Sequence, residues 1–131
     1  MSVGAWEPEQ PTARMEIDRK QLQRFIAAIT SAQPLQEALG AQDRTASILN
    51  RLPGQTWLDE SASWQADEIW QLIRFFTLAE AQLPGWEAGA ESAVIPLAKA
   101  LRQRQQPLSK EQLLWIRQNS DNRYLPYGPL L

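Results

Sequence analysis

The chain has 131 residues, of which 44% are apolar and 21% charged, and it contains neither cysteine nor histidine. The missing cysteines exclude disulfides, thiolate metal sites and cysteine nucleophiles, and the missing histidines exclude a Ser-His-Asp relay and imidazole metal ligands. With a formal charge of −2 and no apolar run near the ~20 residues of a membrane span, the chain is expected to be a cytoplasmic globular protein that does not enter a membrane.

The N-terminal part divides into an arm and the start of a helical domain. Residues 1–14 contain two prolines and no apolar period, so we expect an extended arm there and a single helical domain over 15–131. Asp18 is placed to cap the first helix, and Gln21 can complete the capping box. An apolar stripe at helical spacing follows, formed by Leu22, Phe25, Ile26 and Ile29. This helix should end before Pro34, because the residue preceding a proline avoids helical geometry.

Short helices are expected in the next part of the chain. One covers residues 34–39, with Gly40 as its left-handed terminator. A second is capped by Asp43 and ends before Pro53, where a Pro-Gly pair interrupts the chain. Residues 55–63 have no clear period and are expected to form a connector.

The most apolar segment predicts a central helix at about residues 64–83, with Ser61 and Ser63 as competing caps. Its apolar residues are Ile69, Trp70, Leu72, Ile73, Phe75, Phe76, Leu78 and Ala79. A helix that is apolar nearly all round is surrounded by other helices in a bundle. The fold is therefore expected to be all-α: a single compact bundle of four to six helices around this segment, with extended N- and C-terminal segments.

Two further helices and a tail complete the expected fold. A helix is expected over about residues 91–105. Either it begins near residues 92–95, so that Pro96 lies in the first turn where backbone N–H groups lack partners, or it is kinked there. Ser109 is placed to cap the last helix, with Gln112 completing a capping box. Residues 120–131 are too apolar for a free tail and too rich in proline for a helix, so we expect them to dock in extended form on the bundle or on a partner.

A charge in the middle of the central helix is the first candidate for a binding site. Arg74 needs a partner there, because an unpaired buried charge is costly, and its fork geometry suits a carboxylate or phosphate. A pocket lined by Arg74, Asp67 and Glu68 would suit a small-ligand binder or a metal-dependent enzyme. The alternative is a structural ion pair or an exposed stripe shared with Gln71 and Thr77. The two acidic residues also fit the start of a helix, where they complement the helix dipole, so no metal site and no cofactor are expected.

The C-terminal third suggests a second candidate, because residues 91–131 contain six basic and three acidic residues. The two helices within residues 97–119 could be read as a helix-turn-helix. The whole chain is acidic, however, and cations are also favoured near helix C-termini, so nucleic-acid binding is the weaker alternative. The basic residues concerned are Arg102, Arg104, Lys110 and Arg117.

The leading functional hypothesis is a non-catalytic helical interaction or scaffold protein of a bacterial-type cytosol. No catalytic motif is recognisable, so an enzymatic function is the less favoured hypothesis and no catalytic residue is assigned. Tryptophan and tyrosine dominate binding hot spots, and apolar side chains occur in both terminal segments. A protein partner or a second copy of the chain, as in a homodimer, is therefore expected. The candidate contact residues are Trp6, Tyr124, Tyr127 and Leu130.

Overall fold

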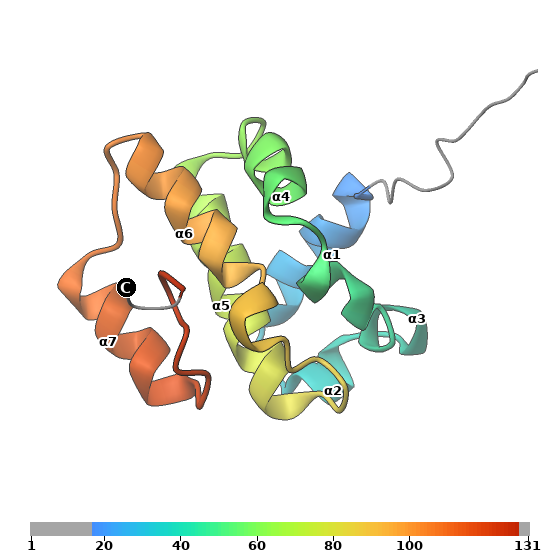
Figure 1. The fold of residues 1–131 in the computed structure, drawn as a ribbon. Helices are drawn as coiled ribbons and strands as arrows, with labels where there is room; N and C mark the ends of the chain where they lie inside the picture. Colours follow the sequence, from blue (N-terminus) through green and yellow to red (C-terminus); the bar gives the residue numbers. More distant parts are fainter. Residues whose placement is uncertain (1–16, 129–131) are drawn as a thin grey trace, which may run out of the picture.

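The computed structural model describes residues 17–128, and this part of the chain is helical without any strand (Figure 1). The α-helices in chain order are α1 (Arg19–Thr30), α2 (Leu35–Ala38), α3 (Ala41–Arg44), α4 (Gly54–Ser61), α5 (Ala66–Gln82), α6 (Val94–Gln103) and α7 (Lys110–Asn119). Two 3₁₀ helices, η2 (Ser47–Arg51) and η3 (Gly89–Glu91), lie between them. None of these helices is long and apolar enough to cross a membrane. The N-terminal arm expected over residues 1–14 lies outside the described part.

The centre of the bundle is α5, which packs against α1, α2, α6 and α7. In Figure 1, α7 lies on one side of α5, and α2 and α3 lie on the other. Seven residues of α5 are buried: Ile69, Leu72, Ile73, Phe75, Phe76, Thr77 and Ala79. The expected all-α bundle around a central apolar helix is therefore confirmed.

The first and last long helices start where their capping residues predicted. The Lys20 N–H donates to the Asp18 carboxylate at the start of α1 (2.9 Å). At the start of α7, the Gln112 N–H donates to the Ser109 hydroxyl (3.1 Å), and the Ser109 N–H donates to the Gln112 side chain (2.8 Å). Each cap satisfies backbone N–H groups that lack partners inside the helix, which is why such local signals locate helix ends well.

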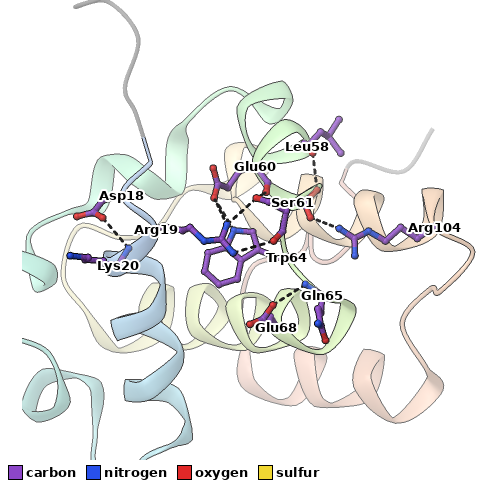
Figure 2. Close-up of polar contacts among 11 residues, drawn as sticks. Asp18, Arg19, Lys20, Leu58, Glu60, Ser61, Trp64, Gln65, Glu68 and Arg104 are labelled. Carbon is purple, nitrogen blue, oxygen red and sulfur yellow. Dashed lines mark hydrogen bonds and ion pairs between the residues drawn. The ribbon is translucent and has the colours of Figure 1, made fainter.

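The start of α5 differs from the prediction that Ser61 or Ser63 caps it. Both hydroxyls instead donate to carbonyl groups three residues earlier, at the end of α4. Gln65 precedes the first helical residue, and its N–H donates to the Glu68 carboxylate (2.9 Å; Figure 2). The two serine hydroxyls therefore bond to carbonyl groups at the C-terminal end of α4. The backbone at the start of α5 is capped by the side chain of Glu68, in the first turn of that helix.

Helix α4 occupies the segment that was expected to be a connector, and it brings the described α-helices to seven. Its anchor is Trp57, which is fully buried. The Trp57 indole N–H donates to the Leu49 carbonyl (3.1 Å), and its ring meets Phe76 of α5 edge to face with centroids 5.2 Å apart. A single aromatic anchor does not create a helical period in the sequence, so tertiary packing stabilises this helix.

The α2–α3 region corrects two further expectations. Gly40 has φ −71°, so it is no left-handed terminator, and it directly precedes α3. Asp43 is no cap but lies inside α3, where it is only 5% exposed. Its carboxylate accepts hydrogen bonds from the Arg24 guanidinium (2.8 and 3.0 Å) and from the Gln21 amide (3.1 Å). Gln21 thus connects α1 to α3 instead of completing the capping box of α1.

The Asp43 contact predicts a pH dependence of stability. The hydrogen bond from Arg24 lowers the pKa of Asp43 below its ordinary value, with burial opposing this shift. A carboxyl whose pKa is lower in the folded state stabilises the fold above its unfolded pKa of about 4, and this contribution is lost as the pH falls through the folded pKa. We therefore expect Asp43→Asn to lower the urea midpoint at pH 7, and we expect its difference from wild type to shrink as the pH falls below about 4. A difference that stays constant with pH would contradict this assignment.

The C-terminal part of the described chain returns to the bundle. In α6, Pro96 is the third residue, so its missing N–H costs no hydrogen bond, as expected. After α7, residues 123–127 form successive turns instead of an extended strand, and no further helix forms there. Leu125 and Pro126 are buried, and the Gly128 N–H closes a turn onto the Tyr124 carbonyl (2.6 Å).

Candidate functional site

A row of four α5 residues remains in contact with solvent in the middle of the bundle. We call this row the outer stripe: Trp70, Gln71, Arg74 and Leu78, all half-buried. Trp70, Arg74 and Leu78 are four residues apart and Gln71 is three before Arg74, so all four lie on one face of the helix. Thr77, which was expected on this stripe, is fully buried, and its hydroxyl donates to the Ile73 carbonyl (2.7 Å).

Arg74 is the charged centre of the outer stripe. One of its guanidinium nitrogens, Nη1, donates to the Gln71 amide oxygen (2.8 Å). The guanidinium carbon lies 5.3 Å from the ring centroid of Trp115 on α7. The ion pairs formed within residues 17–128 join Arg19 to Glu60 and Arg24 to Asp43, so none of them involves Arg74. The structural ion pair, one of the alternatives considered for Arg74, is therefore not formed within residues 17–128, and Arg74 instead contacts an aromatic ring and a neutral amide.

On one side of Arg74, a cavity of about 420 Å³ opens between the end of α1, the following loop and α5. Its apolar lining includes Ala32, Pro34 and Leu78, and its polar lining includes Ser31, Gln33 and Gln82. Among residues 17–128, Arg74 is the only charged residue in its wall. The cavity therefore offers both apolar and uncharged polar contacts next to a single positive charge.

On the other side of Arg74, two tryptophans join α5 to α7. The rings of Trp70 and Trp115 meet edge to face, with centroids 5.7 Å apart and an interplanar angle of 76°. Both are half-buried, whereas the neighbouring Leu114 is 53% exposed. Apolar side chains of both helices therefore remain partly in contact with water, and the two tryptophans do so beside Arg74.

Trp115 and Leu114 were not among the residues singled out from the sequence, although a signal was present. Residues 113–116 are four consecutive apolar residues. Each residue of an α-helix is turned by about 100° from the one before, so four in a row cannot all face one neighbour. Ile116 is buried, and Leu114 lies on the opposite side of α7. The run itself indicated that one of its side chains must face solvent.

The three residues expected to share a ligand pocket do not come together. Asp67 lies on the same side of α5 as Arg74 but seven residues earlier, which is about 10 Å along a helix. Glu68 caps the start of α5, as described above. Within residues 17–128 no group of three side chains of metal-ligand type is arranged to hold a metal ion. Arg74 is therefore the only one of the three residues that borders the cavity.

The four basic residues considered for nucleic-acid binding have two kinds of environment. The Arg102 guanidinium lies over the Tyr127 ring at 4.3 Å, and Arg104, the residue that follows α6, donates to the Ser61 carbonyl of α4 (Figure 2). These two arginines thus have contacts within the bundle. Lys110 and Arg117 are exposed on α7, where they flank Leu114 at spacings of four and three residues.

The C-terminal residues that the sequence suggested as partner contacts are not part of the outer stripe. Tyr124 is half-buried, and its hydroxyl accepts a hydrogen bond from Arg123 (3.2 Å). Tyr127 is 36% exposed and is the more accessible of the two tyrosines. Trp6 and Leu130 lie outside the described residues.

A second cavity, of about 460 Å³, lies between the C-terminal segment and the end of α5 and is bordered by Glu80 and Tyr124. The two Glu80 carboxylate oxygens accept from the Asn50 amide (2.9 Å) and the Asn122 amide (3.0 Å). Asn122 also donates to the Gly89 carbonyl (2.9 Å). These polar groups bind one another across four segments of the chain, which indicates a structural role.

Comparison of the chain with protein-family models, with curated proteins and with solved structures found no match. The function must therefore follow from the chemistry of the surface itself. That surface consists of the outer stripe of α5, the adjoining cavity, and the exposed side of α7.

Proposed function

We propose that this chain is a non-catalytic protein-interaction domain of the cytoplasm, and that it binds its partner through the outer stripe of α5 and the exposed side of α7. One observation carries the proposal. Trp115 and Trp70, both half-buried, leave aromatic surface in water beside Arg74, whose charge has no carboxylate partner within residues 17–128, and the exposed Leu114 precedes Trp115 on α7. Apolar surface that stays in contact with water and is bordered by polar groups is a mark of interaction sites.

The composition of this surface supports a protein partner. Tryptophan and arginine are the residue types most enriched at binding hot spots, and both are present here side by side. Exposed Lys110 and Arg117 flank the apolar Leu114, which resembles the polar rim around the apolar centre of an interface. Arginine, glutamine and indole groups recognise a partner, and none of them exchanges protons readily near neutral pH.

The proposal is tested by purifying the tagged full-length chain from cells and identifying what stays bound. We expect a stoichiometric partner that is lost with Leu114→Glu, because a carboxylate would have to be buried at the interface. Ile48→Glu is the matched control, since Ile48 is 52% exposed but belongs to η2, which follows α3. In Figure 1, α3 and α7 lie on opposite sides of α5.

The control should keep the partner, and both variants should melt close to the wild-type temperature, because neither side chain is buried. Loss of the partner in both variants, or in neither, would contradict the proposed surface. A chain that sediments as a monomer and retains no stoichiometric protein would contradict the interaction function itself.

A further inference from the structure

The outer stripe presents three kinds of chemistry at regular intervals. Leu78 borders the cavity with its apolar side chain, Arg74 supplies a positive charge, and Trp70 belongs to the aromatic pair with Trp115. Each step along the stripe is four residues, which is about 6 Å along an α-helix. The surface therefore presents an apolar, a cationic and an aromatic side chain on successive turns of α5.

The cavity end of the stripe suits an aliphatic side chain. Its accessible apolar surface comes from the half-buried Leu78 and the exposed Ala32 and Pro34, whereas Ile29 and Leu35 in the same wall are buried. Filling the cavity with a leucine or isoleucine side chain would remove apolar surface from water at about 25 cal/mol per Å². The absence of any acidic residue from this wall means that a positively charged group would find no partner there.

Arg74 suits a carboxylate. The hydrogen bond to Gln71 uses one N–H of the guanidinium, and the guanidinium lies over the Trp115 ring. Its other N–H groups form none of the hydrogen bonds found within residues 17–128, so they can bind the two oxygens of a carboxylate. Such a bond, in a site that a partner shields from water, is strong enough to select for an acidic residue.

The charges on α7 point to the same kind of partner. Lys110 and Arg117 are exposed and take part in none of the ion pairs within residues 17–128. Glu111 is the one acidic residue of α7, so this helix is net positive. The exposed Asp67 lies on the same side of α5, beyond Trp70, and has the opposite charge. An acidic residue of the partner is therefore complementary to Arg74 at the centre of the stripe and to the α7 edge, but not to the Asp67 end of the stripe.

We infer, on the basis of the proposed function, that the occupant is an acidic amphipathic helix of a partner protein lying along α5. Its complementary pattern is an aliphatic residue, a glutamate or aspartate four positions later, and an apolar residue three or four positions after that. These side chains meet the cavity, Arg74 and the tryptophan pair in turn. A helix fits better than an extended peptide, because the middle of α5 offers no free backbone groups to pair with a strand.

The test uses three fluorescein-labelled synthetic helical peptides of about 18 residues, a length that can hold helical structure. Each has a leucine four residues before and another three residues after a central position, which is glutamate, glutamine or lysine. The full-length chain is titrated into each peptide at low salt, and anisotropy gives the Kd. We expect the glutamate peptide to bind at least about tenfold more tightly than the other two.

Variants of Arg74 distinguish recognition of the peptide's charge from nonspecific binding of the peptide. Arg74→Gln should remove the preference for the glutamate peptide, and Arg74→Glu should reverse it in favour of the lysine peptide. Both variants should melt close to wild type, because Arg74 forms no buried ion pair within residues 17–128. A reversed preference cannot come from loss of folding, so the reversal would support the inference.

Several results would overturn the inference. Equal binding of the three peptides, or binding of none, rules out recognition of an acidic helix at Arg74. Self-association of the chain that Arg74→Glu abolishes would assign the surface to a second copy. Binding that appears only after removal of residues 1–16 would assign it to the chain's own N-terminal segment. In each case, a cellular partner lost with Leu114→Glu but kept with Ile48→Glu would leave the proposed function standing.

Discussion

Trp86→Ala is expected to lower the free energy of unfolding by about 3–5 kcal/mol. Trp86 is fully buried, and its ring lies within 6.3 Å, centroid to centroid, of Phe25, Phe75 and Phe76. The substitution would leave a cavity among these rings that a close-packed bundle cannot collapse to fill. It would also remove the hydrogen bond that the Trp86 indole N–H donates to the Arg44 carbonyl (2.7 Å). Urea unfolding followed by circular dichroism measures the loss.

The matched control is Trp115→Ala, the same chemical change at a half-buried position. Water can reach the space that this substitution leaves, so we expect less than half of the loss seen at Trp86. Equal losses at the two positions would show that the aromatic cluster around Trp86 does not form the centre of the core.

Asn50→Asp is expected to cost about 3–5 kcal/mol at pH 7, although the two side chains have nearly the same shape. Asn50 is fully buried, and its amide donates to Glu80 (2.9 Å) and to the Trp86 carbonyl (2.7 Å). The substitution replaces this donor by a second carboxylate facing Glu80. Only the acceptor for the Ala93 N–H (2.9 Å) is retained.

The pH dependence distinguishes this mechanism from a simple packing defect. Protonation of one of the two facing carboxyl groups restores a donor, so the loss should shrink as the pH falls toward about 4. Gln23→Glu, an amide-to-acid change at an exposed position of α1, is the control and should cost only a few tenths of a kcal/mol. A loss for Asn50→Asp that is the same at pH 4 and pH 7 would contradict the assigned network.

Local sequence signals predicted most of the long helices. Asp18 and Ser109 cap their helices as expected, because a capping side chain bonds to a backbone N–H only two or three residues away. The apolar run that became α5 was equally informative, since a helix without a wide polar face must be covered by others. Such features depend on neighbours in the sequence and need no knowledge of the fold.

The errors arose where a side chain had a choice of partners. Asp43 could have capped a helix, but in the fold the guanidinium of Arg24, nineteen residues earlier, reaches it. Ser61 and Ser63 could have capped α5, but they close α4. A hydroxyl or carboxylate can satisfy several donors or acceptors, and the distances that choose among them exist only after the helices pack.

The candidate site likewise contains residues that the sequence indicated and residues that only the packing of the helices brings together. Arg74 stood out in the sequence because a charge within an apolar run requires an explanation, and it is the centre of the outer stripe. Asp67 and Glu68 were grouped with it because they are close in sequence, but the helix separates them from it. Residues 70 and 115 are far apart in the chain, so nothing local indicated that their rings meet on one surface.

Helical periodicity and capping residues already predicted helices around an apolar segment that one arginine interrupts. Both signals act over a few residues, so they can be recognised without coordinates. The convergence of Asn50 and Asn122 on Glu80, and the proximity of the cavity, Arg74 and the two tryptophans, could be seen only once the helices had packed. These contacts join residues 30 to 45 positions apart, and their geometry depends on how α1, α5 and α7 pack together.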